Sequence, residues 1–527
     1  MVITTEGHTA SFDLTDGIEL LAGELAYTTK AVSGWTALEP ELSVTWETNP
    51  TFEPVEITND MKGKCNIVIN APAGIKAFTV SMLSDYLNND IELTELDLLN
   101  PQGLETIFDM LNFPYGEKIL NQKTVPFDLT NAVALLEGKS GQHIFTMNVT
   151  DNNNKTINQD ITFFVPEAIS ATVSDIDLWK NTATITLNNA PEGATVQYKR
   201  STESEWKNTT KNPNGTFSIT PSWITEENDA GKTVYSLDNN CGVFAGATYD
   251  WQILNGEAVV ASGTFETSAG DPIENGDMSQ WCETKEMLPL FGSKKITVWY
   301  PGSSWSDSTP GFWDSSNNAG NKTACTQDKT KNASCAWLQA SGVSLVGALA
   351  SGSLFTGTFT YANMNGTASF GQKYKYTARP TALRLKYHAT LGTVNYNKHN
   401  GPLEKDKDIM DQCSFTVCIV DWDTRHDVQS GTSAPKGIWD PITMGELPVD
   451  KQNGIIGYGV KYSSENTPGT DLIPLEIPIK YYQQTNAAPD GENKFTIIIS
   501  VSTSRYGDYL NGCDKNKIYV DDFEWVY

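Results

Sequence analysis

The feature that most constrains the fold is a series of short segments in which apolar and polar side chains alternate. In FTIIISV, residues 495–501, the odd-numbered side chains are all apolar, and the closing segment, residues 517–527, alternates in the same way. A period of two residues is typical of a β-strand with one buried face. Long segments with helical periodicity are nearly absent. The sequence therefore predicts an all-β protein.

The length of the chain predicts more than one domain. A chain of 527 residues is too long for a single hydrophobic core. We predict three β-sandwich domains in series, at residues 1–166, 167–269 and 270–527. The first is expected to contain one or two short helices, because residues 104–111 have apolar side chains at helical spacing. The third has long polar loops between its strands, which predicts a large jelly roll.

The composition excludes some classes of partner. The net charge is −27, and most of the excess acid lies in the first half of the chain. A nucleic-acid-binding protein would carry the opposite sign, so neutral ligands fit best, with divalent cations as additional ligands. No apolar run approaches the roughly 18 residues that a membrane span needs. The first residues have neither a basic segment nor an apolar one, so a secretion signal is absent or not included in this sequence.

The closing strand places one carboxylate in an aromatic row. If its alternation is unbroken, Asp521 shares a face with Tyr519 and Phe523. A buried carboxylate needs a cation or several hydrogen-bond donors. We consider a structural Ca²⁺ ion held by Asp521 together with Glu274 and Asp277. The alternative is that Asp521 accepts backbone amides, or that a bulge turns it toward solvent.

Two loops combine aromatic and polar side chains. A sugar site needs an exposed ring with polar groups beside it, because sugars present flat CH faces and a rim of hydroxyls. The alternative is that the rings fill one end of the sandwich. The candidate ligand-binding residues are Trp305, Trp313, Asp314 and Asn317 in residues 298–321, with Trp439 and Arg425 in residues 420–441.

An enzymatic reading rests on clustered acids. Glycoside hydrolysis needs two carboxylates about 5–10 Å apart. The sequence selects no pair, and it contains no GxSxG, HExxH or P-loop motif. We therefore assign no catalytic residue and favour a protein that is not an enzyme. The acids that cluster in sequence are Asp421, Asp423, Asp427, Asp440 and Glu446.

The eight cysteines include no CxxC pair, which argues against a zinc ribbon. Cys325 and Cys335 flank a polar loop, so a disulfide bond between them is one option. The spacing does not settle whether the cysteines are oxidised.

Several motifs of the C-terminal half resemble a known family. The segments DPIENGDMSQW, SGSLFTGTF, ARPTALRLKYHA and SVSTSRYGDYLNGCDKNKIYVDDFEWVY resemble the putative carbohydrate metabolism domain of surface lipoproteins from Bacteroides-type gut bacteria. The resemblance covers about residues 272–527 and implies a jelly roll of the galactose-binding type. Arg379 and Asp508 match its Arg-Pro-Thr and Tyr-Gly-Asp motifs. We expect both to be structural, with a place in a site as the alternative.

The rest of the chain resembles domains found in the same kind of lipoprotein. FDLTNAVALLEGKSGQHIFTMNVTD, residues 127–151, is similar to an uncharacterised N-terminal β-sandwich domain. Residues 167–269 resemble a fibronectin type III domain, with Tyr249 at the place of its tyrosine corner. Such domains are commonly spacers.

These observations favour a non-catalytic glycan-binding lipoprotein of a nutrient-uptake system. The resemblance implies a location on the cell surface at the outer membrane, through a signal and a lipidated cysteine that are not in this sequence. The partner would be a glycan or oligosaccharide and not a nucleic acid. The first alternative is a glycoside hydrolase or lyase. The second is a scaffold subunit that docks on an outer-membrane nutrient transporter.

Overall fold

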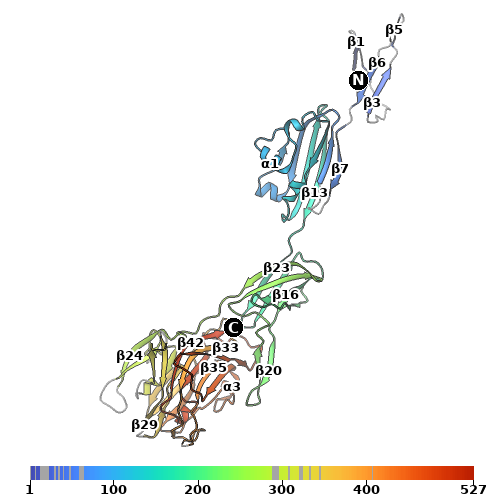
Figure 1. The fold of residues 1–527 in the computed structure, drawn as a ribbon. Coiled ribbons are helices and arrows are strands. Elements are labelled where there is room, and N and C mark those ends of the chain that lie inside the picture. Colours follow the sequence, from blue (N-terminus) through green and yellow to red (C-terminus); the bar gives the residue numbers. More distant parts are fainter. Residues whose placement is uncertain are drawn as a thin grey trace. The chain divides into compact units, whose positions relative to one another are not determined.

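The computed structural model describes two compact units, residues 1–169 and 170–527. The described residues are 2–5, 8–11, 23–28, 31–33, 36–38, 41–46, 49–57, 65–287, 296–306, 309–319, 324–331, 334–343, 346–405 and 407–527. Strands account for 48% of the structure and helices for 7%, which confirms the predicted all-β class. Figure 1 shows this succession of strands, with few helices between them. No helix of the described residues is long and apolar enough to span a membrane.

In the first unit, two of the sheets enclose one hydrophobic core. The core includes Phe78 and Phe127, whose ring centroids are 5.1 Å apart. One sheet has the order β10-β9-β12-β13, from Glu95–Asp97, Ile75–Leu83, Gly141–Asp151 and Thr156–Val165. The other has the order β11-β8-β7, from Thr124–Asp128, Cys65–Asn70 and Thr51–Ile57. The helical segments are α1 (Glu105–Leu111), α2 (Thr130–Ala134), η1 (Tyr86–Asp90) and η2 (Gly116–Lys118). The earlier strands are β1 (Val2–Thr5), β2 (His8–Ser11), β3 (Gly23–Thr28), β4 (Ala31–Ser33), β5 (Thr36–Leu38) and β6 (Glu41–Trp46).

The second unit begins with two four-stranded sheets. The first has the order β14-β15-β19-β18, from Ser170–Asp177, Thr182–Asn188, Phe217–Ile219 and Thr210–Lys211. The second has the order β17-β16-β22-β23, from Lys207–Asn208, Thr195–Arg200, Thr248–Asn255 and Ala258–Glu266. The hydroxyl of Tyr249 accepts a hydrogen bond from the Phe244 amide at 2.8 Å, which is the contact a tyrosine corner makes. The hairpin of β20 (Trp223–Glu227) and β21 (Thr233–Leu237) leaves these sheets and joins the next one.

Residues from 281 onward form two larger sheets. The first, called here the groove sheet, has the order β20-β21-β39-β37-β35-β40-β31-β32-β36. After the hairpin its strands are Lys480–Tyr481, Ile455–Ser463, Cys413–Trp422, Phe495–Ser502, Ser353–Ala362, Asn365–Phe370 and His426–Gly431, with β26 (Trp313–Ser315) paired to β31. The second, the closing sheet, has the order β27-β28-β42-β33-β38, from Cys325–Asp328, Cys335–Gln339, Lys517–Val526, Ala382–Thr390 and Ile473–Pro478.

Shorter elements complete this part. Two-stranded pairs are β24 (Trp281–Met287) with β25 (Ile296–Pro301), β29 (Ser341–Val343) with β30 (Ala348–Ala350), and β34 (Tyr396–Asn397) with β41 (Asn511–Gly512). The helical segments are α3 (Val449–Asn453), η3 (Ser316–Ala319) and η5 (Gly507–Tyr509).

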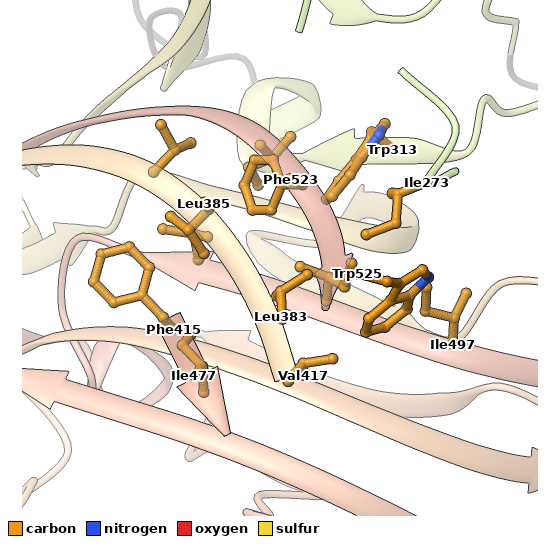
Figure 2. Packing of buried hydrophobic residues seen from close by; sticks show 14 of the residues in the cluster. Ile273, Trp313, Leu383, Leu385, Phe415, Val417, Ile477, Ile497, Phe523 and Trp525 are labelled. Atoms are coloured by element: carbon orange, nitrogen blue, oxygen red, sulfur yellow. The ribbon is translucent and has the colours of Figure 1, made fainter. Parts of the chain in front are cut away.

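The main core lies between the groove sheet and the closing sheet. Figure 2 shows Leu383 and Leu385 of β33 packed with Phe415 and Val417 of β35. All four are at most 1% exposed, since alternation turns every second side chain of these strands inward. Fully burying a side chain of this size contributes about 1.5–3 kcal/mol. Burial of these faces accounts for the two-layer arrangement.

A buried arginine joins the first sheets of this unit to the groove sheet. Arg379 is 1% exposed, and its Nε donates to the Trp179 carbonyl at 2.6 Å. Its guanidinium lies 4.6 Å from the ring centroid of Trp179, 5.3 Å from that of Trp223 and 5.0 Å from that of Tyr481. Arg379 is therefore a structural residue, as the sequence predicted.

The closing strand is not one unbroken alternation. Asp522 has a φ of 54°, and the pairing of β42 with β33 shifts register at this point. Ile518 and Val520 are buried before the bulge, whereas Phe523 and Trp525 are buried after it. The predicted aromatic row is therefore wrong, because Tyr519 lies on the outer face and stacks on Trp337 at 5.7 Å between ring centroids.

All eight cysteines lie in the described part of the chain and are free. Cys325 pairs with Leu338 in the β27–β28 ladder, and Cys335 pairs with Asp328. Three positions along a strand separate the two by about 10 Å, beyond the roughly 7 Å that a disulfide bond can span. The disulfide considered from the sequence is therefore excluded by the register.

Candidate functional site

A groove of about 570 Å³ lies on the face of the groove sheet that points away from the core. Its floor is built from small side chains that stand in register on neighbouring strands. Ser414 of β35 pairs with Ser502 of β40, which pairs with Ser353 of β31. Two positions along, on the same face of the sheet, Thr416 pairs with Ser500, which pairs with Phe355. The floor is hollow over Ser353, Ser414, Thr416, Ser500 and Ser502, because these side chains are small while their neighbours in sequence fill the core.

Aromatic side chains form the walls of this groove. Each of the following is half-buried, so one part of the ring is held by the protein and another part faces the groove. Such rings are the surfaces on which the CH faces of sugars stack. The half-buried aromatic residues that line the groove are Phe359, Tyr361, Phe370, Trp439, Tyr462, Tyr506 and Tyr509.

Most charged residues of the groove are engaged by the protein. The guanidinium of Arg505 stacks 3.6 Å from the ring centroid of Tyr462 and donates to the Gln412 side chain. The Asp440 carboxylate accepts the amides of Ile442 and Thr443, both at 2.9 Å. The Glu446 carboxylate accepts the Gly437 amide at 2.5 Å. Arg505, Asp440 and Glu446 are therefore held by contacts within the protein and form part of the groove walls.

Asp508 differs from the other acids of the groove. Its side chain is exposed, and no hydrogen bond or ion pair reaches its carboxylate among the described residues. Water reaches this carboxylate, but the surrounding groove walls displace part of its hydration, which raises the pKa of Asp508 to about 6. The sequence prediction that Asp508 is structural is therefore wrong for its side chain, which lines the groove.

The structure places the predicted sugar-stacking tryptophans inside the protein. Trp313 is fully buried and packs against Phe523, 5.0 Å between ring centroids (Figure 2). Trp305 is 7% exposed and stacks on Tyr300 at 3.8 Å. The expectation that these two rings are exposed is wrong, because both rings fill gaps between strands.

Their polar neighbours are also internal. The Asp314 carboxylate accepts the Phe359 amide at 2.7 Å, and the Asn317 side chain bonds the backbone of Trp299 and Cys325. Asp314 is 0% exposed and Asn317 is 1% exposed. These contacts hold β26 and η3 in place, and neither side chain reaches the groove surface.

The two predicted ligand-binding residues of residues 420–441, Trp439 and Arg425, lie in different places. Trp439 lines the groove and packs against Phe370 and Trp422. Arg425 lies outside the groove lining, where it donates to the Gly371 carbonyl at 2.9 Å and lies over the Phe495 ring. Of the six predicted ligand-binding residues, the structure thus brings only Trp439 to the groove.

The clustered acids do not converge on one site. Asp421 and Asp423 both face Lys494, at 3.1 and 3.8 Å, and Asp427 is exposed outside the groove lining. Asp440 and Glu446 line the groove but are engaged by backbone amides. No two of these five acids stand as free carboxylates in the groove.

The three predicted calcium ligands, Asp521, Glu274 and Asp277, do not form a cluster that could hold a metal ion. Among the described residues, no group of three or more His, Cys, Asp or Glu side chains is arranged to hold a metal ion. Asp521 is 1% exposed and accepts the Asp522 amide. Glu274 is exposed, and the Asp277 carboxylate accepts the Ser279 hydroxyl at 2.9 Å. The three carboxylates therefore do not fit the proposed calcium site.

Comparison with known proteins agrees with a carbohydrate-related role for this part of the chain. The fold defines a β-sandwich unit, and one outer face of this unit carries an aromatic-lined groove. Residues 265–526 match the family model described as "Putative carbohydrate metabolism domain". No curated protein matches the chain.

Solved structures match the chain at low sequence identity and low structural similarity. One is the crystal structure of a putative glycoside hydrolase from Bacteroides thetaiotaomicron, at 15% identity and a TM-score of 0.31, covering 64% of this chain and 98% of that one. Another, of a putative glycoside hydrolase from Bacteroides vulgatus, has 15% identity and a TM-score of 0.32, covering 47% of this chain and 97% of that one. A third is a Bacteroides ovatus glucan-utilization protein in complex with a mixed-linkage heptasaccharide, at 8% identity and a TM-score of 0.13, covering 86% of this chain and 100% of that one. At these values the likeness transfers no function.

Proposed function

We propose that residues 270–527 bind a glycan in the groove and do not cleave it. The observation that carries this proposal is the combination of a hollow Ser/Thr floor with half-buried aromatic walls. Hydroxyl groups on the floor can donate to and accept from sugar hydroxyls, while the rings stack on sugar faces. The match of this segment to a carbohydrate-related family model supports the same ligand class.

Binding is favoured over hydrolysis by the state of the carboxylates. Hydrolysis uses two carboxyl groups, about 5–10 Å apart, one as an acid and one as a base or nucleophile. Among the described lining residues, Asp508 is the one carboxylate that no backbone amide or cation engages. We expect no reducing ends to be released from any glycan that the protein binds.

The test is a glycan array on the full chain, followed by calorimetry with the best ligand. Tyr361→Ala combined with Tyr509→Ala removes two half-buried wall rings. Each lost stacking contact is expected to weaken binding by about 0.5–1.5 kcal/mol, so Kd rises by about 5- to 150-fold for the pair. Trp206→Ala is the matched control, because Trp206 is exposed and lies outside the groove. Unchanged affinity in the double variant contradicts the proposed site.

A surface lipoprotein in a nutrient-uptake system is the setting we propose for this binding. The support is the resemblance of the motifs to lipoproteins of that kind. Isolation of the native protein from membranes, with identification of its N-terminal modification and of co-purifying transporter subunits, tests this setting. A native protein without a lipid modification would contradict it.

A further inference from the structure

The backbone fixes Asp508 at the edge of the groove. The turn η5 packs closely against its neighbours, since a Cβ atom on Gly507 would lie 2.8 Å from that of Ser351. The Ser430 hydroxyl donates to the Asp508 carbonyl, and the His399 amide donates to the Tyr509 carbonyl at 3.2 Å. Leu510, which follows the turn, is 9% exposed. The carboxylate is thus held in place by contacts that leave its own oxygens unpaired.

Among the charged residues that line the groove, Asp508 and Lys398 are the two whose charged groups are engaged by no hydrogen bond or ion pair in the described part of the chain. Arg505 is engaged by Tyr462 and Gln412, whereas Asp440 and Glu446 are engaged by backbone amides. Partial desolvation by the groove walls raises the pKa of Asp508 to about 6, so the group is ionised at neutral pH and has lost part of its water shell. A charge in such a place interacts more strongly with ligand groups than a charge in bulk water does.

We propose that Asp508 makes the groove selective for uncharged glycans and against glycans that carry carboxylate groups. This inference rests on the proposed function. The two oxygens of the ionised carboxylate accept hydrogen bonds from neighbouring sugar hydroxyls. A uronate at the same position has a carboxylate instead of a hydroxymethyl group, so it removes a donor and adds a repulsive charge. Selectivity then comes from attraction to one ligand and repulsion of the other.

The selectivity depends on pH. Above about pH 6 Asp508 is ionised and repels a uronate, whereas below that value it is protonated and the repulsion is lost. The uronate itself stays ionised across this range, because ordinary carboxylic acids have pKa values near 4. The other titratable or charged groups on the elements around η5 and across the groove are His426 and Asp427 of β36, Lys398, His399, Arg505, Tyr506, Tyr509, Asp440 and Glu446.

The experiment compares the full chain on matched pairs of neutral and anionic polymers: galactan with polygalacturonate, mannan with polymannuronate, and glucan with polyglucuronate. Kd is measured at pH 7.5 and pH 5.0 for the native sequence and for Asp508→Asn. We expect the native protein at pH 7.5 to prefer a neutral polymer over its uronate partner by about tenfold or more. Most of this preference should be lost in Asp508→Asn at pH 7.5. It should also be lost in the native protein at pH 5.0. The preference of Asp508→Asn should be the same at the two pH values.

Two controls separate Asp508 from its surroundings. Asp427→Asn removes the same charge from the neighbouring strand outside the groove lining and is expected to leave the preference unchanged. His399→Gln removes the nearby imidazole and is expected to leave the pH dependence of the preference unchanged. At pH 7.5 the melting temperature of Asp508→Asn should be equal to or higher than that of the native protein, because the substitution removes a carboxylate whose ionised form the groove walls disfavour.

The outcomes distinguish this inference from the proposed function. Binding of a uronate polymer as tightly as its neutral partner, or an unchanged preference in Asp508→Asn, overturns the inference alone. Failure of the native protein to bind any of the six polymers or any glycan on the array overturns the proposed function and this inference with it.

Discussion

Phe415 and Thr416 are neighbours in sequence, yet the pleat of β35 gives them opposite roles. Phe415 is 1% exposed in the core, whereas Thr416 is half-buried on the floor of the groove. The same division holds in β40, where Val501 is buried and Ser502 lines the groove. A single strand therefore stabilises the sandwich through one face and lines the groove with the other.

This division predicts two separable effects. Thr416→Trp should fill the groove and abolish glycan binding with little change in stability, because the new ring enters open space above the sheet. Phe415→Ala should lower the free energy of unfolding by about 3–5 kcal/mol through the cavity it leaves. Urea unfolding and calorimetric titration check the pair. Loss of binding in Phe415→Ala at a temperature where it is folded, or tight binding by Thr416→Trp, would contradict the assignment of the faces.

At the level of elements, the hairpin β20–β21 and Arg379 join strands that are far apart in sequence. Tyr235 of β21 pairs with Tyr481 of β39, and the Arg379 guanidinium lies against rings from both parts. These contacts explain why residues 170–527 form one compact unit, where the sequence predicted two domains.

Arg379→Ala is predicted to loosen this junction. Loss of a fully buried side chain, its hydrogen bonds and its contacts with three rings should cost about 3 kcal/mol or more. Arg384→Ala is the matched control, because its ion pairs with Glu476 and Glu524 are exposed and such pairs contribute about 0–1 kcal/mol. Equal losses in urea unfolding of the two variants would show that Arg379 does not hold the junction.

At the scale of the whole molecule, the groove and the proposed calcium ligand lie on different sheets. Asp521 belongs to β42 of the closing sheet, whereas the groove floor belongs to β31, β35 and β40. Glycan affinity is therefore expected to be the same in EDTA as in buffer with Ca²⁺, and titrations in both buffers check this. Binding that chelation abolishes would show a metal-dependent groove.

Alternation in the sequence was sufficient to predict the strands, the all-β class and the buried faces, since a period of two residues depends only on the pleat of a single strand. The predicted aromatic row of Tyr519, Asp521 and Phe523 is wrong because of the bulge at Asp522. Such a register shift depends on the partner strand, which the alternation of one strand does not reveal. The aromatic loop at Trp305 and Trp313 was misplaced, because composition does not distinguish a ring that fills a core from one that meets a ligand. Ser500 and Ser502 of FTIIISVSTS belong to the groove floor, but the sequence did not show this, because the floor also needs residues from the neighbouring strands.

The sequence by itself determined which segments are strands and which strand faces are apolar, because both follow from the two-residue period of a single strand. Only the tertiary structure decided which polar faces come together, because strand order brings Ser353, Ser414 and Ser502 into one row from three distant segments. It also decided the environment of Asp508, because the pKa of a carboxyl group depends on the residues that surround it, and the residues that line this groove come from segments between Ser316 and Leu510.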